Sequence, residues 1–146
     1  MMCRTVLAVA AVALGITAVA AQSDPIAARK ALMKANGDQA KAGAAMVKGD
    51  APFDLAKAKV IFVTFVDAAG KMPNLFPDNS KTGGETTAAP KIWQDQADFK
   101  ARFEKFAADS KAAESKITDL ASFKESFSAV AKNCGGCHEL YRVKKS

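Results

Sequence analysis

The sequence is poor in the residues that most often form metal clusters and covalent crosslinks. It has three cysteines and one histidine among 146 residues. That scarcity excludes a four-cysteine zinc site, a framework of several disulfides and a histidine-rich metal tract. Tyrosine and tryptophan occur once each and phenylalanine nine times, so we expect a phenylalanine-rich core. Apolar residues make up 49% and charged residues 25%, which is typical of one globular domain rather than a disordered or membrane-filling chain.

Residues 1–21 have the pattern of a secretory signal peptide. Arg4 supplies a positive charge, the residues after it are uncharged and apolar, and the segment ends on small side chains. We expect cleavage after Ala20 or Ala21 and a single domain over residues 22–146. An uncleaved anchor is the alternative, but the alanine-rich run has about the minimum length that spans a bilayer. Cleavage removes Arg4 and one cysteine, which leaves 20 Lys and Arg against 15 Asp and Glu, a net charge of +5.

The remaining sequence predicts an all-α protein, because its apolar residues recur with helical spacing. We expect four helices, at about residues 25–48, 53–70, 92–115 and 120–143. Residues 57–67 are the best strand candidate, but no turn residues flank them and we interpret them as buried helix. Two of the links are short, which predicts an antiparallel four-helix bundle. The connection over residues 71–91 is rich in proline and glycine, and a loop of this length would pack on the bundle or cross it.

The last helix has an apolar seam that contains two cysteines. Its members are spaced three and four residues apart: Leu120, Phe123, Phe127, Val130, Cys134, Cys137 and Tyr141. This spacing predicts that the seam faces the interior of the bundle. On the first helix Gly37, Ala40 and Ala44 are small, so a bulky group could approach that helix closely.

Residues 134–138 read Cys-Gly-Gly-Cys-His, the C-x-x-C-H pattern of covalent haem c attachment. Thiols at positions i and i+3 leave a helix in the same direction and can form thioether bonds to the two vinyl groups of one porphyrin. The neighbouring histidine then supplies the proximal iron ligand. We therefore expect one covalently bound haem c near the C-terminus, with Cys134 and Cys137 as its anchors and His138 on the iron.

Three other interpretations of these residues are open. A thioredoxin-type dithiol normally accompanies a βαβ unit, whereas this motif lies near the end of an all-helical chain. A zinc site needs four ligands, and no second ligand pair is present. A simple disulfide fits an exported protein but gives His138 no role. Iron binding would engage the only histidine, so we expect no catalytic residue and no enzymatic activity.

Beyond the motif itself, the mature chain resembles the class II c-type cytochromes, the cytochrome c′ family. In that family the haem motif lies near the C-terminus of a four-helix bundle, and an arginine follows the histidine by four residues, as Arg142 follows His138 here. The segments Leu75–Asp78 and Pro90–Trp93 are similar to the loop of the low-spin members, the cytochrome c-556 type.

The resemblance also implies a role for the first helix. The family has an arginine followed four residues later by the side chain above the distal face of the haem, and here these are Arg29 and Met33. Five-coordinate members usually have an apolar residue at the second position, whereas the c-556 type has a methionine that binds iron. Met33 is thus implied as the distal ligand, and an ordinary core methionine is the alternative. Arg29 and Arg142 are candidates for contacts with the haem propionates, with solvated charge as the alternative.

Together these observations predict a periplasmic monohaem cytochrome that carries single electrons between redox partner proteins. Ligation by methionine and histidine raises the reduction potential and suits electron transfer. The alternative is a five-coordinate haem protein that binds nitric oxide or carbon monoxide as a sensor or scavenger. The resemblance allows a homodimer. We expect no nucleic-acid partner, because the lysines are spread over all segments, and no membrane insertion after cleavage.

Overall fold

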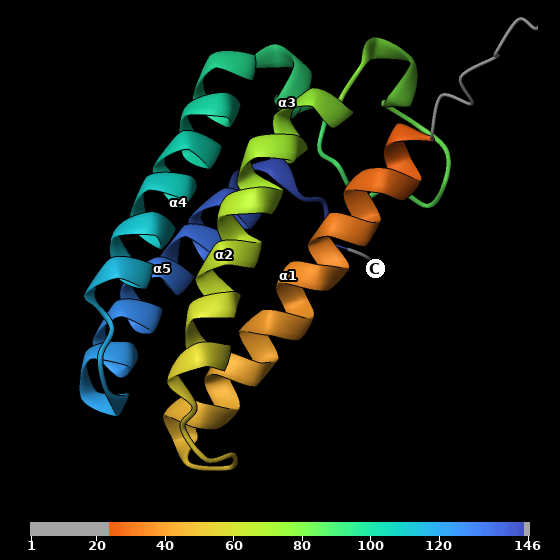
Figure 1. The fold of residues 1–146 in the computed structure, drawn as a ribbon. Coiled ribbons are helices and arrows are strands. Elements are labelled where there is room, and N and C mark those ends of the chain that lie inside the picture. Colours follow the sequence, from red (N-terminus) through yellow and green to blue (C-terminus); the bar gives the residue numbers. More distant parts are fainter. Residues whose placement is uncertain (1–23, 145–146) are drawn as a thin grey trace, which may run out of the picture.

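The protein is an antiparallel bundle of four long helices (Figure 1). The computed structural model describes residues 24–144, so the signal peptide predicted for residues 1–21 lies outside the described residues. The long helices are α1 (Pro25–Lys48), α2 (Leu55–Lys71), α4 (Gln96–Lys116) and α5 (Leu120–Tyr141), and the short ones are η1 (Met72–Leu75), η2 (Asp78–Ser80) and α3 (Lys91–Gln94). The predicted all-α class is confirmed. In this part of the chain no helix is long and apolar enough to cross a membrane.

The ends of α1 and α5 follow from local sequence. Asp24 caps α1 by accepting a hydrogen bond from the amide of Ile26, and Gly49 ends the helix in the left-handed conformation, with φ of 84°. Asp119 and Ser122 form a reciprocal capping box at the start of α5. The prediction for the first helix is confirmed, and the last helix ends at Tyr141, two residues earlier than predicted.

The helix predicted over residues 92–115 is two helices, with a break at Asp95. Its backbone leaves the helical region at φ −137°, and its side chain accepts a hydrogen bond from the amide of Asp98 at 3.3 Å. Aspartate competes with helix continuation in this way because its short carboxylate can cap the next helix. The apolar spacing from Ile92 to Phe99 runs through the break, so periodicity alone missed it.

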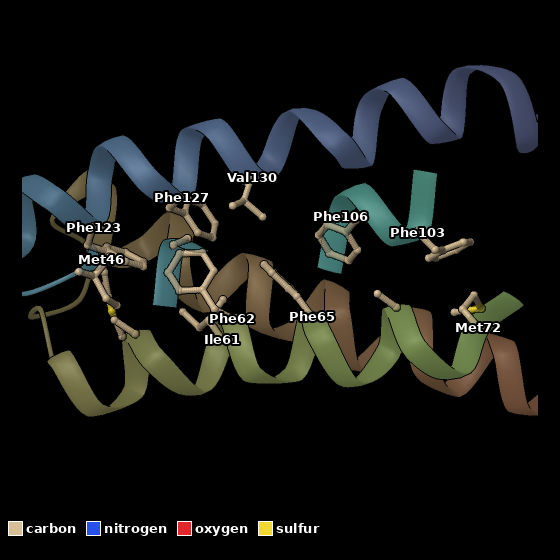
Figure 2. Close-up of a cluster of buried hydrophobic side chains, with 14 of the residues drawn as sticks. Met46, Ile61, Phe62, Phe65, Met72, Phe103, Phe106, Phe123, Phe127 and Val130 are labelled. Carbon is tan, nitrogen blue, oxygen red and sulfur yellow. The ribbon is translucent and has the colours of Figure 1, made fainter. Parts of the chain in front are cut away.

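The core is rich in phenylalanine, as the composition predicts. Figure 2 shows rings from α2 and α5 meeting between the two helices. Phe62 and Phe123 are fully buried, and their ring centroids lie 6.0 Å apart in an edge-to-face arrangement. Such pairs contribute about 0.5–1.5 kcal/mol beyond the burial of their area. This packing fills the end of the bundle opposite the long connection.

The buried face of α2 is broader than the apolar spacing of its sequence indicates. Leu55 at its start is 37% exposed, and Val66 is only half-buried. Helix α2 packs on both α1 and α4, so its buried arc is broad and includes adjacent positions such as Ile61 and Phe62. A single stripe of one residue per turn is too narrow for a helix with two neighbours.

The long connection packs on the bundle and is pinned beside the end of α5. The amide of Ala89 donates to the carbonyl of Tyr141 at 3.0 Å, and the amide of Val143 donates to the carbonyl of Thr87 at 2.9 Å. These bonds flank an isolated antiparallel bridge between Ala88 and Arg142. The end of the long connection, just before α3, is therefore fixed next to the residues that follow the Cys-Gly-Gly-Cys-His motif.

Helix α1 packs tightly against α5 at Gly43. The glycine is buried, and a Cβ atom at that position would overlap the ring of Phe127. Because the helices are antiparallel, the residues of α1 before Gly43 face the residues of α5 after Phe127. The close contact thus sets where the two helices can begin to separate.

We predict that Gly43→Ala lowers the free energy of unfolding by about 1–3 kcal/mol, because the new methyl group displaces the Phe127 ring. Gly70→Ala is the matched control, since a Cβ at that helical position meets nothing within 4 Å. We expect the control to gain about 0.5–1 kcal/mol. Denaturant unfolding of both variants measures the difference, and equal stabilities would contradict the close-contact interpretation.

Candidate haem-binding site

A pocket opens between α1 on one side and α4 and α5 on the other, beyond the contact of Gly43 with Phe127. It has a volume of about 220 Å³ and adjoins a second pocket of about 480 Å³ that extends towards the long connection. Five residues line both pockets: Met33, Gly37, Phe103, Cys137 and His138. The two side chains predicted as iron ligands therefore lie in one cavity, although they are more than 100 residues apart in the sequence.

Helix α5 supplies the wall that carries the motif. Cys134 is exposed and Cys137 half-buried, and both line the first pocket together with His138. The seam residues before them, from Phe123 to Val130, are buried in the core. Desolvation by neighbouring side chains raises the pKa of both thiols. Redox-active dithiols have lowered thiol pKa values, so this environment is unlike that of a thioredoxin-type site.

The environment of His138 lowers the pKa of its imidazole. Partial desolvation lowers its pKa below the ordinary value, and the charge of Arg142 one turn later lowers it further. The lowered pKa favours the neutral ring, whose nitrogen lone pair can bind iron. In the described residues no group of three or more His, Cys, Asp or Glu side chains is placed to hold a metal ion.

Helix α1 supplies the opposite wall. Met33, Asn36, Gly37 and Ala40 line the first pocket within two turns of this helix. A Cβ at Gly37 would meet no other atom within 4 Å, which leaves open space along the helix surface. The predicted small residues Gly37 and Ala40 thus border the cavity, whereas Ala44 lies outside its lining.

The chemistry of the two pockets fits a haem. The first is almost wholly apolar, with rings from α2 and α4 that suit the porphyrin plane: Phe65, Phe103 and Phe106. The second pocket also has exposed cationic groups, which suit the two carboxylates of a haem: Lys30, Lys34 and Arg142. The thiols and the imidazole of the motif lie at the first pocket, within reach of the same group.

Arg29 lies in the second pocket but its charge is turned into the protein. The residue is only 4% exposed. Its guanidinium donates four hydrogen bonds to the long connection, at 2.7–3.0 Å, to Leu75 O, to Ser80 Oγ and O, and to Thr86 Oγ1. It also stacks over Phe76, 4.6 Å from the ring centroid. Burial lowers the pKa of Arg29, and Asp24 opposes that effect. The resemblance indicated Arg29 as a site residue but did not predict its hydrogen bonds to the long connection.

A second polar cluster, missed in the sequence, joins α4 to the motif. Arg102 Nε pairs with Asp98 at 2.6 Å, and Arg102 Nη1 donates to the carbonyl of Gly136 at 3.2 Å. The hydroxyl of Tyr141 donates to the same Asp98 carboxylate at 2.5 Å. The spacing of Asp98 and Arg102 by four residues is a signal for the ion pair, but nothing local indicates its link to Gly136.

A four-helix bundle that carries Cys-Gly-Gly-Cys-His beside an apolar pocket defines a bundle-type c-type cytochrome. The family model described as Cytochrome C′ matches residues 24–142 of this chain. The chain belongs to the cytochrome c′ family. Covalently bound haem c is the cofactor of this family, whose members are monohaem electron carriers or gas-binding cytochromes.

Individual relatives cover nearly the whole chain. A cytochrome c′ of Rhodopseudomonas palustris is 47% identical over 92% of this chain and 92% of its own length. A cytochrome c-556 of the same organism is 34% identical over 99% of both chains. The solved structure of cytochrome c′ from Rhodopseudomonas palustris superposes with a TM-score of 0.83, at 47% identity, over 86% of this chain and 100% of that one. The predicted resemblance and the bundle fold are confirmed.

We predict that Arg29→Lys destabilises the protein by about 2–4 kcal/mol, because a lysine cannot reach all the acceptors of the guanidinium. Lys30→Ala is the control on the same helix, since its side chain is exposed and its contacts with Gly84 and Glu85 are at the surface. We expect the control to change stability by less than about 1 kcal/mol. Thermal unfolding of both haem-loaded variants measures the difference. An Arg29→Lys protein as stable as wild type would show that the hydrogen bonds of Arg29 do not stabilise the fold.

Tyr141 provides a pH-dependent test of the second cluster. Burial first, and then the hydrogen bond and charge of Asp98, raise the pKa of Tyr141 to about 12, above its ordinary value of about 10. A raised folded pKa contributes stability that is fully present below pH 10 and is lost as the pH rises through 12. The difference in unfolding free energy between wild type and Tyr141→Phe should therefore become smaller as the pH rises through this range, because only the wild type loses the contribution of the tyrosine hydroxyl.

The single tyrosine makes the ionisation directly observable. In protein with ¹³C-labelled tyrosine, we expect one Cζ resonance whose chemical shift changes near pH 12. In Asp98→Asn the midpoint should move towards 10, because the neutral amide no longer disfavours the phenolate. A wild-type midpoint near 10 would show that Tyr141 does not donate to Asp98 in solution.

Proposed function

We propose that this protein is a periplasmic electron carrier whose single haem c is low spin, with His138 and Met33 as the axial ligands. One observation carries the proposal: Met33 from α1 and His138 from α5 line the same apolar pocket, together with both motif cysteines. A thioether and a neutral imidazole are the ligand pair that gives c-type cytochromes a raised reduction potential. The predicted signal peptide supports export to the periplasm.

Each wall of the pocket has a separate task in this proposal. When bound, haem iron supplies a couple that accepts or donates one electron. Cys134 and Cys137 hold the porphyrin by thioether bonds, and His138 donates the lone pair that its lowered pKa keeps free. The surrounding phenylalanines exclude water, which limits the solvent reorganisation that accompanies a change of charge. No side chain is required to transfer a proton, so the proposal includes no enzymatic step.

The arginines have unequal roles in this proposal. The four terminal N–H groups of Arg29 are hydrogen-bonded to the long connection, so only its Nε–H remains for a propionate. Arg142 is exposed and lines the second pocket. We therefore assign the main propionate contact to Arg142 and a positioning role to Arg29.

A five-coordinate gas-binding cytochrome is the second candidate function. The observation in its favour is the identity of 47% to a protein named cytochrome c′, against 34% to a cytochrome c-556. The two candidates differ only in whether the thioether of Met33 occupies the sixth position of the iron. Either protein would act in the periplasm. An electron carrier would exchange electrons with redox partner proteins, and a gas-binding cytochrome would bind gases. Both functions fit a monomer or a homodimer.

We predict that the purified protein shows a low-spin optical spectrum and that Met33→Ala converts it to high spin, because alanine has no donor atom for iron. The reduction potential should fall in the same variant. Optical spectra of both redox states and a potentiometric titration measure these changes.

Two methionine variants serve as controls for this experiment. Met46→Leu changes a core residue at the closed end of the bundle, far along α1 from Met33, and should remain low spin. Met72→Leu tests a second methionine as a possible ligand, because Met72 lines the second pocket and is 1% exposed. A wild-type protein that is already high spin would exclude ligation by Met33 and favour the gas-binding function.

A further inference from the structure

Arg102 is a charged side chain of the first pocket to which the proposed function gives no role. It extends from α4, is half-buried, and lines the pocket together with Cys137 and His138. Among the described residues, no other permanently charged side chain lines this pocket. The remaining walls are apolar or neutral, so the charge of Arg102 is the main fixed charge beside the cavity.

Three contacts fix the guanidinium of Arg102 between α4 and the motif. Nε pairs with the Asp98 carboxylate at 2.6 Å, Nη1 donates to the carbonyl of Gly136 at 3.2 Å, and Cζ lies 5.7 Å from the centroid of the Tyr141 ring. A Cβ atom at Gly136 would be 3.9 Å from Nη1, so the guanidinium lies against the turn of α5 between the two anchor cysteines. Arg102 thereby joins α4 to the backbone two residues before His138.

The two charges of this ion pair differ in their distance from the cavity. Arg102 lines the first pocket, whereas Asp98 lines neither of the two pockets. The guanidinium bridges the carboxylate and Gly136, because its Nε and Nη1 atoms bond to different partners. Asp98 Oδ2 also accepts the hydroxyl of Tyr141, which holds the carboxylate at that position. The pair therefore presents its positive end to the cavity.

A positive charge beside the cavity favours one oxidation state of a bound haem iron. The ferric form carries one more positive charge than the ferrous form, so a nearby cation disfavours the ferric form by Coulomb repulsion. Solvent screens this repulsion less than at the open surface, because Arg102 is half-buried and phenylalanine side chains share the pocket lining. The Asp98 carboxylate opposes the effect from outside the lining, so the net effect of the pair is a higher reduction potential.

We infer that Arg102 raises the reduction potential of the haem through its charge and positions the motif turn through its hydrogen bond to Gly136. Asp98 orients the guanidinium and offsets part of its charge. The inference rests on the haem site of the proposed function, but it does not depend on whether Met33 is the sixth ligand. The potential is then set from α4 as well as by the axial ligands.

The test compares the reduction potentials of Arg102→Gln and Asp98→Asn in the haem-loaded protein at low ionic strength. Glutamine removes the cation, so we expect the equilibrium constant for reduction to fall by about three- to tenfold. Asparagine removes the carboxylate and leaves the cation, so the equilibrium constant should rise. Opposite shifts from the two partners of one ion pair indicate a charge effect, since a loosened structure would move both variants in the same direction.

Two further variants serve as controls. Arg102→Lys keeps the charge, so its potential should stay closer to wild type than that of Arg102→Gln. Lys105→Gln is the matched control, because Lys105 pairs with Asp109 on the same helix at 2.5 Å, also four residues apart, but lines neither pocket. It should leave the potential unchanged. If Arg102→Gln does not retain haem, the rise in Asp98→Asn carries the test.

Three results would overturn the inference: an unchanged or raised potential in Arg102→Gln, a fall in Asp98→Asn, or an equal fall in Lys105→Gln. These outcomes are separate from a failure of the proposed function. That failure appears as a high-spin spectrum of the wild-type protein, whose potential and whose variants can be measured in the same way. The role of Arg102 is therefore tested independently of ligation by Met33.

Discussion

The burial of the Arg29 guanidinium is the interaction on which the open end of the bundle depends. Its hydrogen bonds reach η1, η2 and the segment that follows them, and that segment is bridged to the residues after α5. One side chain thereby connects these parts of the chain. A buried cation is costly unless its donors are paired, and the terminal N–H groups of Arg29 are bonded to this segment, so the segment can adopt few alternative positions. Met33 lies one turn after Arg29 on α1, and both residues line the second pocket.

The bundle divides its two ends between stability and ligand binding. At one end Gly43 and Phe127 bring α1 against α5, and the phenylalanine core is continuous there (Figure 2). At the other end the same two helices enclose the cavity. A cavity of this size forgoes the packing energy of a filled core. A group that binds the folded state recovers that energy and stabilises the fold, so the cofactor completes the core as well as the redox site.

Much of the fold and part of the site could be predicted from the sequence, because their signals are local. The caps at Asp24 and Asp119 and the seam of α5 depend on residues within a few turns of one another. The Cys-Gly-Gly-Cys-His motif is local in the same sense. The break at Asp95 was not predicted, because the helical spacing of apolar residues continues through the position where Asp95 caps α4. The role of Arg29 depends on hydrogen-bond partners far away in the sequence, which only the tertiary structure brings near.

The two candidate functions follow from one competition within the pocket. A thioether supplied by the chain is present at a high effective concentration, so an external ligand must bind more tightly than Met33 to displace it. In the proposed function, the balance between electron transfer and gas binding therefore depends on the Met33 side chain of α1.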